Sequence, residues 1–260
     1  MVKAIFFDID GTLVSFETHS IPQSTIEAIT ILKKKGIKVF IATGRAYSLI
    51  NNLGDLKFDG YITLNGSCSL AGDLSIIHKN GICQADIQSL VNYQQQGKSF
   101  PCTFVAADES FVYNRNSKVE EVEKLLNMDF GPEKELSYVL NKEVLQIVSF
   151  FDEDSENEIM SNVLPNCASA RWNPLFTDVI AKGNSKRSGI DKVLEYYDID
   201  LSESVSFGDG GNDISMLEYT PISIVMGNAS DEIKKYATLV TDSVDENGVW
   251  NALKKLGLIH

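Results

Sequence analysis

Histidine is scarce in this chain, which has three histidines among 260 residues. A zinc site built on histidines and a Ser-His-Asp triad are therefore poorly supported. The four cysteines include no Cys-x-x-Cys pair, so we expect free thiols in a reducing compartment. No apolar run is long enough to cross a membrane, and the first one ends at Asp8, too early for a signal peptide. These features predict a cytoplasmic protein.

Positive charge is also in deficit, because 23 Lys and Arg residues stand against 36 Asp and Glu residues, for a net charge of −13. A surface of this sign repels nucleic acid and anionic membranes, so we expect neither as a partner. The negative charge does not exclude a small anionic substrate, because a bound metal and a lysine can make the electrostatic potential positive within a pocket. The oligomeric state is not indicated by the sequence.

Apolar runs and helical periodicity alternate in the first and last thirds of the chain. The expected strands are 4–7, 37–42, 61–64, 205–207 and 222–225. The expected helices are one that begins at Pro22, one that ends within 51–56, and those at 185–197 and 230–236. Alternation of strands and helices with short loops predicts a parallel sheet with right-handed crossovers.

The middle of the chain, from about residue 82 to residue 180, follows a different pattern. The expected helices there are 86–96, 118–126 and 154–163, and the expected strands are 103–106, 110–113, 144–150, 168–171 and 177–180. Paired strands with short turns predict an antiparallel sheet backed by helices. One domain is therefore expected to be inserted into another.

Two carboxylates follow the first expected strand, in Asp8-Ile9-Asp10-Gly11-Thr12. Ligands of open α/β sheets bind at the carboxyl ends of the strands. Two like charges so close are costly to bury unless a cation joins them, and oxygen ligands favour Mg²⁺. The alternative is an Asx-type turn, since Asp-Gly is a common turn pair. The position directly after a hydrophobic strand favours the metal site.

Three later segments also fall at a strand end or a helix start: Thr43-Gly44-Arg45, 182–186 and 208–213. The Thr43 hydroxyl and nearby N–H groups could hold phosphate oxygens, although Thr-Gly is also common in turns. Lys186, which opposes a helix dipole, is either an ordinary surface residue or a cation kept there to meet an anion. Asp209 and Asp213 could both face a metal, and the alternative is a glycine-rich loop capped by Asn212 or Asp213.

Together these four segments resemble the four motifs of the haloacid dehalogenase (HAD) superfamily of phosphotransferases, in the expected order. The insertion between the second and third motifs resembles that of subclass IIB, the Cof-like sugar phosphatases. The resemblance implies an α/β fold with a Rossmann-like parallel-sheet catalytic core at 1–81 and 181–260. It also implies an inserted α+β substrate-specificity cap at 82–180, with an antiparallel sheet backed by helices, and Mg²⁺ as the cofactor.

The resemblance also implies roles for single residues. Asp8 matches the nucleophile, which takes the phosphoryl group as an aspartyl phosphate. Asp10 matches the general acid and later base, and also the position whose backbone carbonyl binds Mg²⁺. Asp209 matches the third Mg²⁺ ligand, and Asp213 a residue that supports the metal. The residues expected to bind phosphate or substrate are Ile9, Thr43, Gly44, Arg45, Lys186 and Asn212. Thr43 and Lys186 are also expected to be catalytic. Lys186, and not the nearby Lys182, matches the lysine of the third motif.

The sequence thus predicts a Mg²⁺-dependent phosphomonoester hydrolase that acts on small phosphorylated metabolites such as sugar phosphates. One alternative is a phosphomutase of the same superfamily, and another is a non-catalytic regulator that binds a phosphometabolite. A regulator has no need of a nucleophile and an acid so placed. Within the cap, Arg171 and Trp172 could contact a sugar, although we favour Trp172, Phe104 and Phe150 as filling of the cap core.

Overall fold

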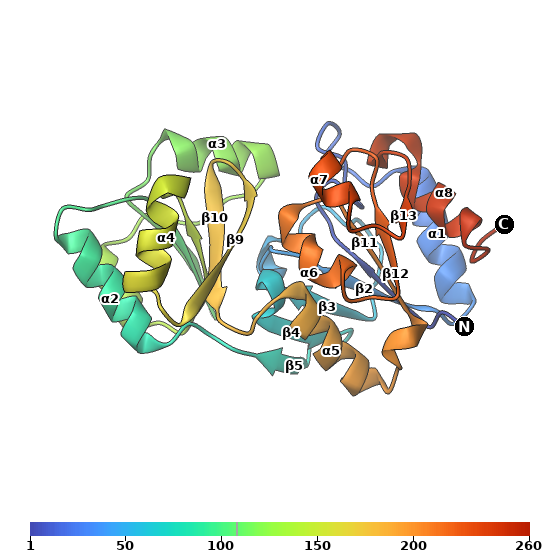
Figure 1. The fold of residues 1–260 in the computed structure, drawn as a ribbon, viewed down its shortest axis with the longest axis horizontal. Coiled ribbons are helices and arrows are strands. Elements are labelled where there is room, and N and C mark those ends of the chain that lie inside the picture. The colour runs from blue at the N-terminus through green and yellow to red at the C-terminus, as the bar shows by residue number, and fades with distance from the viewer. Residues whose placement is uncertain (108) are drawn as a thin grey trace. The chain divides into compact units, whose positions relative to one another are not determined.

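The computed structural model describes residues 1–107 and 109–260, with Trp172 through its backbone only. Contacts divide the chain into two compact units. The core unit comprises Met1–His78 and Ser185–His260, and the inserted unit comprises Lys79–Asn184. Both chain ends therefore belong to the core unit, and the inserted unit is one continuous segment (Figure 1).

The core unit is built on an eight-stranded sheet with the order β13-β12-β11-β1-β2-β3-β4-β5. The strands are β1 (Ala4–Phe7), β2 (Lys38–Ala42), β3 (Gly60–Thr63), β4 (Cys68–Ala71), β5 (Ile76–Lys79), β11 (Ser204–Gly208), β12 (Ile222–Val225) and β13 (Leu239–Val240). Neighbours from β13 to β3 run parallel, whereas β4 runs antiparallel to β3. The parallel core that the sequence predicted is therefore confirmed, with an antiparallel addition at one edge.

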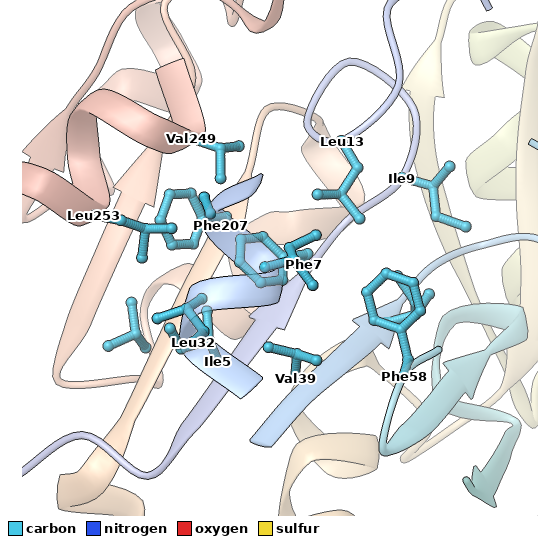
Figure 2. Packing of buried hydrophobic residues seen from close by; sticks show 14 of the residues in the cluster. Ile5, Phe7, Ile9, Leu13, Leu32, Val39, Phe58, Phe207, Val249 and Leu253 are labelled. Atoms are coloured by element: carbon cyan, nitrogen blue, oxygen red, sulfur yellow. The ribbon is translucent and has the colours of Figure 1, made fainter. Parts of the chain in front are cut away.

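Helices cover both faces of this sheet. Successive side chains of β1 therefore alternate between two apolar layers, one on each face. Ile5 and Phe7 pack with α1 (Gln23–Lys34) and α8 (Gly248–Lys255), as Figure 2 shows. Ala4 and Phe6 pack on the other face with α5 (Lys186–Tyr197), α6 (Ile214–Leu217) and α7 (Asp231–Lys234). Each fully buried Phe stabilises the fold by ~1.5–3 kcal/mol, so β1 is a firm support for the loop that follows it.

Several elements of the core unit differ from the sequence prediction. The expected helix end at 51–56 is wrong, because the structure has only a 3₁₀ turn at Tyr47–Leu49 and Gly54 adopts a left-handed conformation, with φ of +57°. Strands β4, β5 and β13 were missed, and each has four residues or fewer. Helix α8 was missed as well. None of these differences moves the strand ends that carry the motif residues.

The inserted unit has a five-stranded sheet of order β7-β6-β8-β10-β9, in which every pair of neighbours is antiparallel. Its strands are β6 (Cys102–Ala106), β7 (Ser110–Tyr113), β8 (Val144–Ser149), β9 (Cys167–Asn173) and β10 (Phe176–Ala181). Its helices are α2 (Gln84–Gln95), α3 (Ser117–Leu126) and α4 (Glu153–Asn162). The antiparallel sheet backed by helices is confirmed. Among the described residues, no helix combines the length and apolar character that a membrane span requires.

Candidate active site

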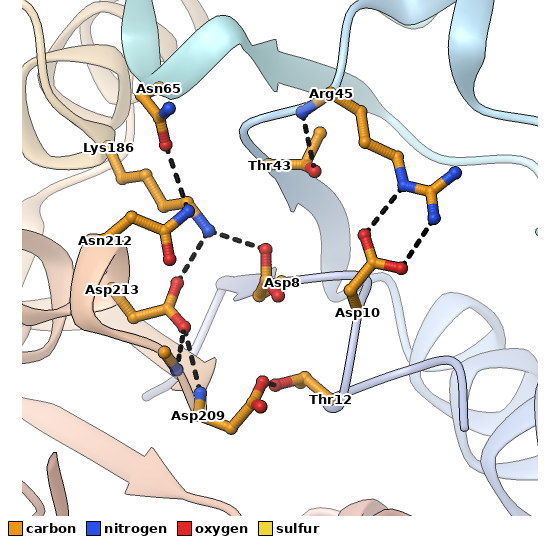
Figure 3. Close-up of polar contacts among 11 residues, drawn as sticks. Asp8, Asp10, Thr12, Thr43, Arg45, Asn65, Lys186, Asp209, Asn212 and Asp213 are labelled. Atoms are coloured by element: carbon orange, nitrogen blue, oxygen red, sulfur yellow. Dashed lines mark hydrogen bonds and ion pairs between the residues drawn. The ribbon is translucent and has the colours of Figure 1, made fainter. Parts of the chain in front are cut away.

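The motif residues of the core unit meet where several parallel strands end (Figure 3). Asp8 follows β1, Thr43 follows β2 and Asp209 follows β11, and these strands are neighbours in the sheet. Parallel strands end at one edge, so loops that are distant in sequence lie together there. Lys186 reaches the same place from the first residue of α5.

Lys186 joins two of the carboxylates. Its Nζ donates to Oδ1 of Asp8 and to Oδ1 of Asp213, at 2.6 Å each, and the lysine is 0% exposed. Ser185 caps the helix by accepting from the Ser188 amide, which fixes the direction in which Lys186 leaves the backbone. Gly66 lies against this cap, where a Cβ atom would come within 2.1 Å of the Ser185 carbonyl oxygen. The ammonium group is therefore held rigidly between the two acids.

Asp8, Asp209 and Asp213 form an acidic cluster whose ligand atoms all lie within 4.8 Å of one another. Oδ2 of Asp213 accepts from the backbone amides of Asp209 and Gly210 at 2.9 and 2.8 Å. Oδ1 of Asp209 accepts from the Thr12 hydroxyl at 2.8 Å. These hydrogen bonds orient the carboxylates before any ligand arrives.

The charges of this cluster do not balance, since one lysine serves three carboxylates. Burial, together with the nearby Asp213 and Asp10, raises the pKa of Asp8 to about 7 in spite of Lys186. Burial and the same kind of repulsion raise the pKa of Asp209 well above its usual range. Burial lowers the pKa of Lys186, but the two aspartates more than offset this and the net shift is upward. An all-oxygen, negatively charged donor set of this kind fits a hard divalent cation.

Asp10 has a different partner from Asp8. Both of its carboxylate oxygens accept from Arg45, Oδ2 from Nε at 2.7 Å and Oδ1 from Nη2 at 2.6 Å. Arg45 is only 5% exposed, and its Nη1 also donates to the Leu49 carbonyl oxygen at 3.2 Å. The two acids of the Asp8-Ile9-Asp10 segment are thus each paired with their own cation.

The other expected phosphate-binding residues are placed as follows. The Thr43 hydroxyl is buried and accepts from the Arg45 amide at 3.1 Å, and Gly44 lies between the two. Asn212 donates to the Asn65 side chain at 3.1 Å. The side chain of Ile9 is packed in the hydrophobic core, which leaves only its backbone for a ligand.

Three residues at the site were missed by the sequence prediction, namely Thr12, Asn65 and Asn228. Asn65 follows β3 in an Asn-Gly pair with φ of +50°, a turn signal at the same edge of the sheet. Asn228 follows β12, and its Nδ2 donates to the Gly11 carbonyl oxygen at 2.9 Å. Their places after strands of the parallel sheet were the available signal.

The inserted unit contains the residues considered for sugar contact. Arg171 donates to Glu156 at 2.8 Å and to the Phe151 carbonyl oxygen at 3.1 Å, and is therefore held by its own unit. Phe104 and Phe150 are buried in the apolar clusters of that unit, as favoured. The Trp172 side chain lies outside the described residues. Lys182 belongs to this unit and donates to the Pro165 carbonyl oxygen.

Comparison with known proteins gives one family for the whole chain. A family model described as haloacid dehalogenase-like hydrolase matches residues 5–253. A solved structure described as the HAD subclass IIB sugar phosphatase BT4131 is 43% identical, covers 99% of this chain and 100% of its own, and superposes with a TM-score of 0.93. The phosphatase BT1666 from Bacteroides thetaiotaomicron is 36% identical over 100% of this chain and 96% of its own, with a TM-score of 0.91.

A further solved structure, described as showing a conserved trigonal-bipyramidal intermediate in a phosphoryl-transfer superfamily, is 42% identical. It covers 100% of both chains with a TM-score of 0.94.

Proposed function

The chain belongs to the haloacid dehalogenase-like hydrolases, as a HAD subclass IIB Cof-like phosphatase, and from this premise we propose a specific reaction. It is the Mg²⁺-dependent hydrolysis of small phosphomonoesters, sugar phosphates above all, through an aspartyl phosphate on Asp8. The observation that carries the proposal is the pairing of Asp8 with Lys186 beside Asp209 and Asp213, while Asp10 stands apart with Arg45.

In the first half of the reaction, an oxygen of Asp8 attacks phosphorus and the bond to the leaving oxygen breaks. Asp10, in its protonated form, gives its proton to the departing alcohol. A carboxylate that approaches a phosphate meets electrostatic repulsion, which the buried ammonium of Lys186 reduces. In the second half Asp10 takes a proton from water, the water oxygen attacks phosphorus, and the Asp8 carboxylate and inorganic phosphate are released.

We propose that Asp8, Asp209, Asp213 and the backbone carbonyl of Asp10 hold Mg²⁺. The donor set supports this, because its oxygens are preorganised and carry more negative charge than Lys186 neutralises. When bound, the ion supplies charge neutralisation for the phosphoryl group. Asp213 has a second role in this proposal, because its Oδ2 accepts from the amides of Asp209 and Gly210 and so orients the loop that carries Asp209.

The phosphoryl group and substrate are proposed to be bound by Ile9, Thr43, Gly44, Lys186 and Asn212. Arg45 was expected among them, and its pairing with Asp10 supports a separate role, which is argued below. The buried Thr43 hydroxyl and Lys186 are supported most directly, since each has a polar atom at the strand ends where Asp8 lies. The inserted unit, proposed as the specificity cap, would select the leaving group. The substrate is proposed to be a small phosphorylated metabolite, with no nucleic acid or membrane as partner. The cytoplasm is the proposed compartment, because the cysteines are free thiols.

The first experiment measures inorganic phosphate released from a panel of sugar phosphates and other phosphomonoesters, with Mg²⁺ and with EDTA. We expect release that depends on the metal and is lost in Asp8→Asn. Asp55→Asn serves as a control, since Asp55 is an exposed residue outside the site. A mutase would convert its substrate without releasing phosphate, and a binding protein would do neither. Either result, with Mg²⁺ present, would refute the hydrolase.

A further inference from the structure

The geometry points to Arg45 as the positioning residue for Asp10, an inference that rests on the proposed roles of Asp8 and Asp10. We propose that Arg45 acts on the reaction by fixing the orientation of the Asp10 carboxylate. Its main effect would fall on the half-reaction in which Asp10 must reach a water molecule.

The contact between Arg45 and Asp10 consists of two hydrogen bonds, which together fix the orientation of the carboxylate. Nε and Nη2 of Arg45 each donate to a different oxygen of Asp10, at 2.7 and 2.6 Å, so the carboxylate plane is aligned with the guanidinium plane (Figure 3). A lysine can supply a charge but not this two-point alignment. The choice of arginine therefore concerns geometry as well as charge.

Arg45 is itself held from several directions. Its amide donates to the Thr43 hydroxyl at 3.1 Å, its carbonyl oxygen accepts from the Leu64 amide at 3.1 Å, and its Nη1 donates to the Leu49 carbonyl oxygen. The backbone of Arg45 is thus fixed relative to the ends of both β2 and β3, and its guanidinium is held by the Leu49 carbonyl oxygen. Because Arg45 is held in place, it can hold the carboxylate of Asp10, which lies on a different loop, in one orientation.

Asp10 needs such support because it lies in the turn after β1, next to Gly11, which has φ of +83°. A general acid or base acts only within hydrogen-bond reach of the proton it transfers. A misplacement of about 1 Å costs on the order of 100-fold in rate. Removal of one arm of the fork therefore slows the steps of Asp10, whereas a residue that binds substrate would chiefly raise KM when altered.

The test uses Arg45→Lys with p-nitrophenyl phosphate, whose leaving group departs without much acid assistance. We expect kcat to fall ~10- to 100-fold and KM to fall with it, so that kcat/KM, which reports the phosphorylation step, changes less than about threefold. Phosphorylation of Asp8 stays fast with this substrate, while water attack is slowed. Rapid mixing should therefore show a burst of p-nitrophenol close to one equivalent of enzyme, followed by a slow steady rate.

Two comparisons make the test specific. The double variant Asp10→Asn/Arg45→Lys should lose no more of kcat than the more severe of the two single variants, because both changes act on the same carboxylate. Arg115→Lys alters an arginine paired with Glu123 at 2.5 Å in the inserted unit and should give no burst. If Arg45→Lys does not fold, as judged by far-UV circular dichroism, Arg45→Gln, which keeps one donor for Asp10, takes its place.

The outcomes separate this inference from the proposed function. A wild-type protein that releases no phosphate refutes the function itself. A wild-type protein that turns over, with an Arg45 variant that has a raised KM, a slowed burst phase or an unchanged kcat, refutes only the positioning role. A raised KM with a slowed burst would assign Arg45 to direct contact with the substrate.

Discussion

Replacement of the proposed nucleophile should make the metal-free protein more stable. The pKa of Asp8 lies at about 7 in the folded protein, compared with 3.8 for the free side chain, chiefly because of burial. The folded state therefore binds the proton more tightly than the unfolded state. The stability that this gives is fully present below pH 3.8 and is lost as the pH rises through about 7. The loss amounts to about 4 kcal/mol at pH 8, and an asparagine in this position escapes it.

We expect Asp8→Asn to unfold at a higher temperature than the wild type at pH 8 in EDTA. At ~2–4 °C per kcal/mol, the difference is roughly 8–16 °C. At pH 5.5 the wild type has lost only about 2 kcal/mol of unfolding free energy, so the difference in unfolding temperature between the variant and the wild type should be about half as large. Mg²⁺ should narrow it further, because a cation beside Asp8 stabilises the ionised wild-type site.

Thermal unfolding followed by circular dichroism at the two pH values, with and without EDTA, measures these differences. Asp55→Asn is the matched control, because Asp55 is exposed and its replacement should leave the midpoint unchanged at both pH values. A variant of Asp8 that is no more stable than the wild type at pH 8 would show that attraction to Lys186 outweighs burial, and the reasoning would fail.

Other changes at the site test the same electrostatics. Lys186→Met leaves Asp8 and Asp213 buried without their shared cation, so we expect a loss of about 3–5 kcal/mol in unfolding free energy and no measurable phosphate release; a normal denaturation midpoint would contradict this. Thr12→Val removes the hydroxyl that orients Asp209. The Mg²⁺ concentration for half-maximal activity should then rise about 10- to 100-fold, and an unchanged titration curve would exclude that role.

The strands of the core unit could be predicted from sequence where apolar runs are bounded by turn residues. β12 matches its expected range, 222–225, to the residue, and β1 ends where Asp8 interrupts the run. The expected helix end at 51–56 failed because Leu53 and Leu56 suggest a helical spacing that the left-handed Gly54 interrupts. Strands β4 and β5 were missed because Cys-Ser-Leu-Ala has no β-branched or aromatic residue and Ile-Ile-His-Lys ends in two polar ones, whereas the equally short β1 and β12 are rich in such residues.

The location of the candidate site was also predictable, because each motif follows a strand or begins a helix. The partners within it were not. Asp10 and Arg45 are 35 residues apart, and Asp8 and Lys186 are 178 apart. Which cation meets which acid depends on the loop conformations, which local sequence patterns do not encode. The sequence prediction grouped Arg45 with the phosphate-binding residues for this reason, and its contact with Asp10 became visible only in the fold.

The sheet order has a consequence for the way a ribosome delivers this protein. β1 pairs with β11 from Ala4 opposite Ser204 onward, so one edge of β1 has no partner until residues beyond 204 have been made. At ~5–20 residues per second this wait lasts roughly 10–40 s, during which the edge of a hydrophobic strand is open to pairing with other chains. The inserted unit has all its strand partners between residues 79 and 184, and its ends are tied by hydrogen bonds of 2.9 Å between Asn80 and Asn184. We therefore expect the middle of the chain to assemble first during synthesis, and the half-made core to be the species that needs a chaperone.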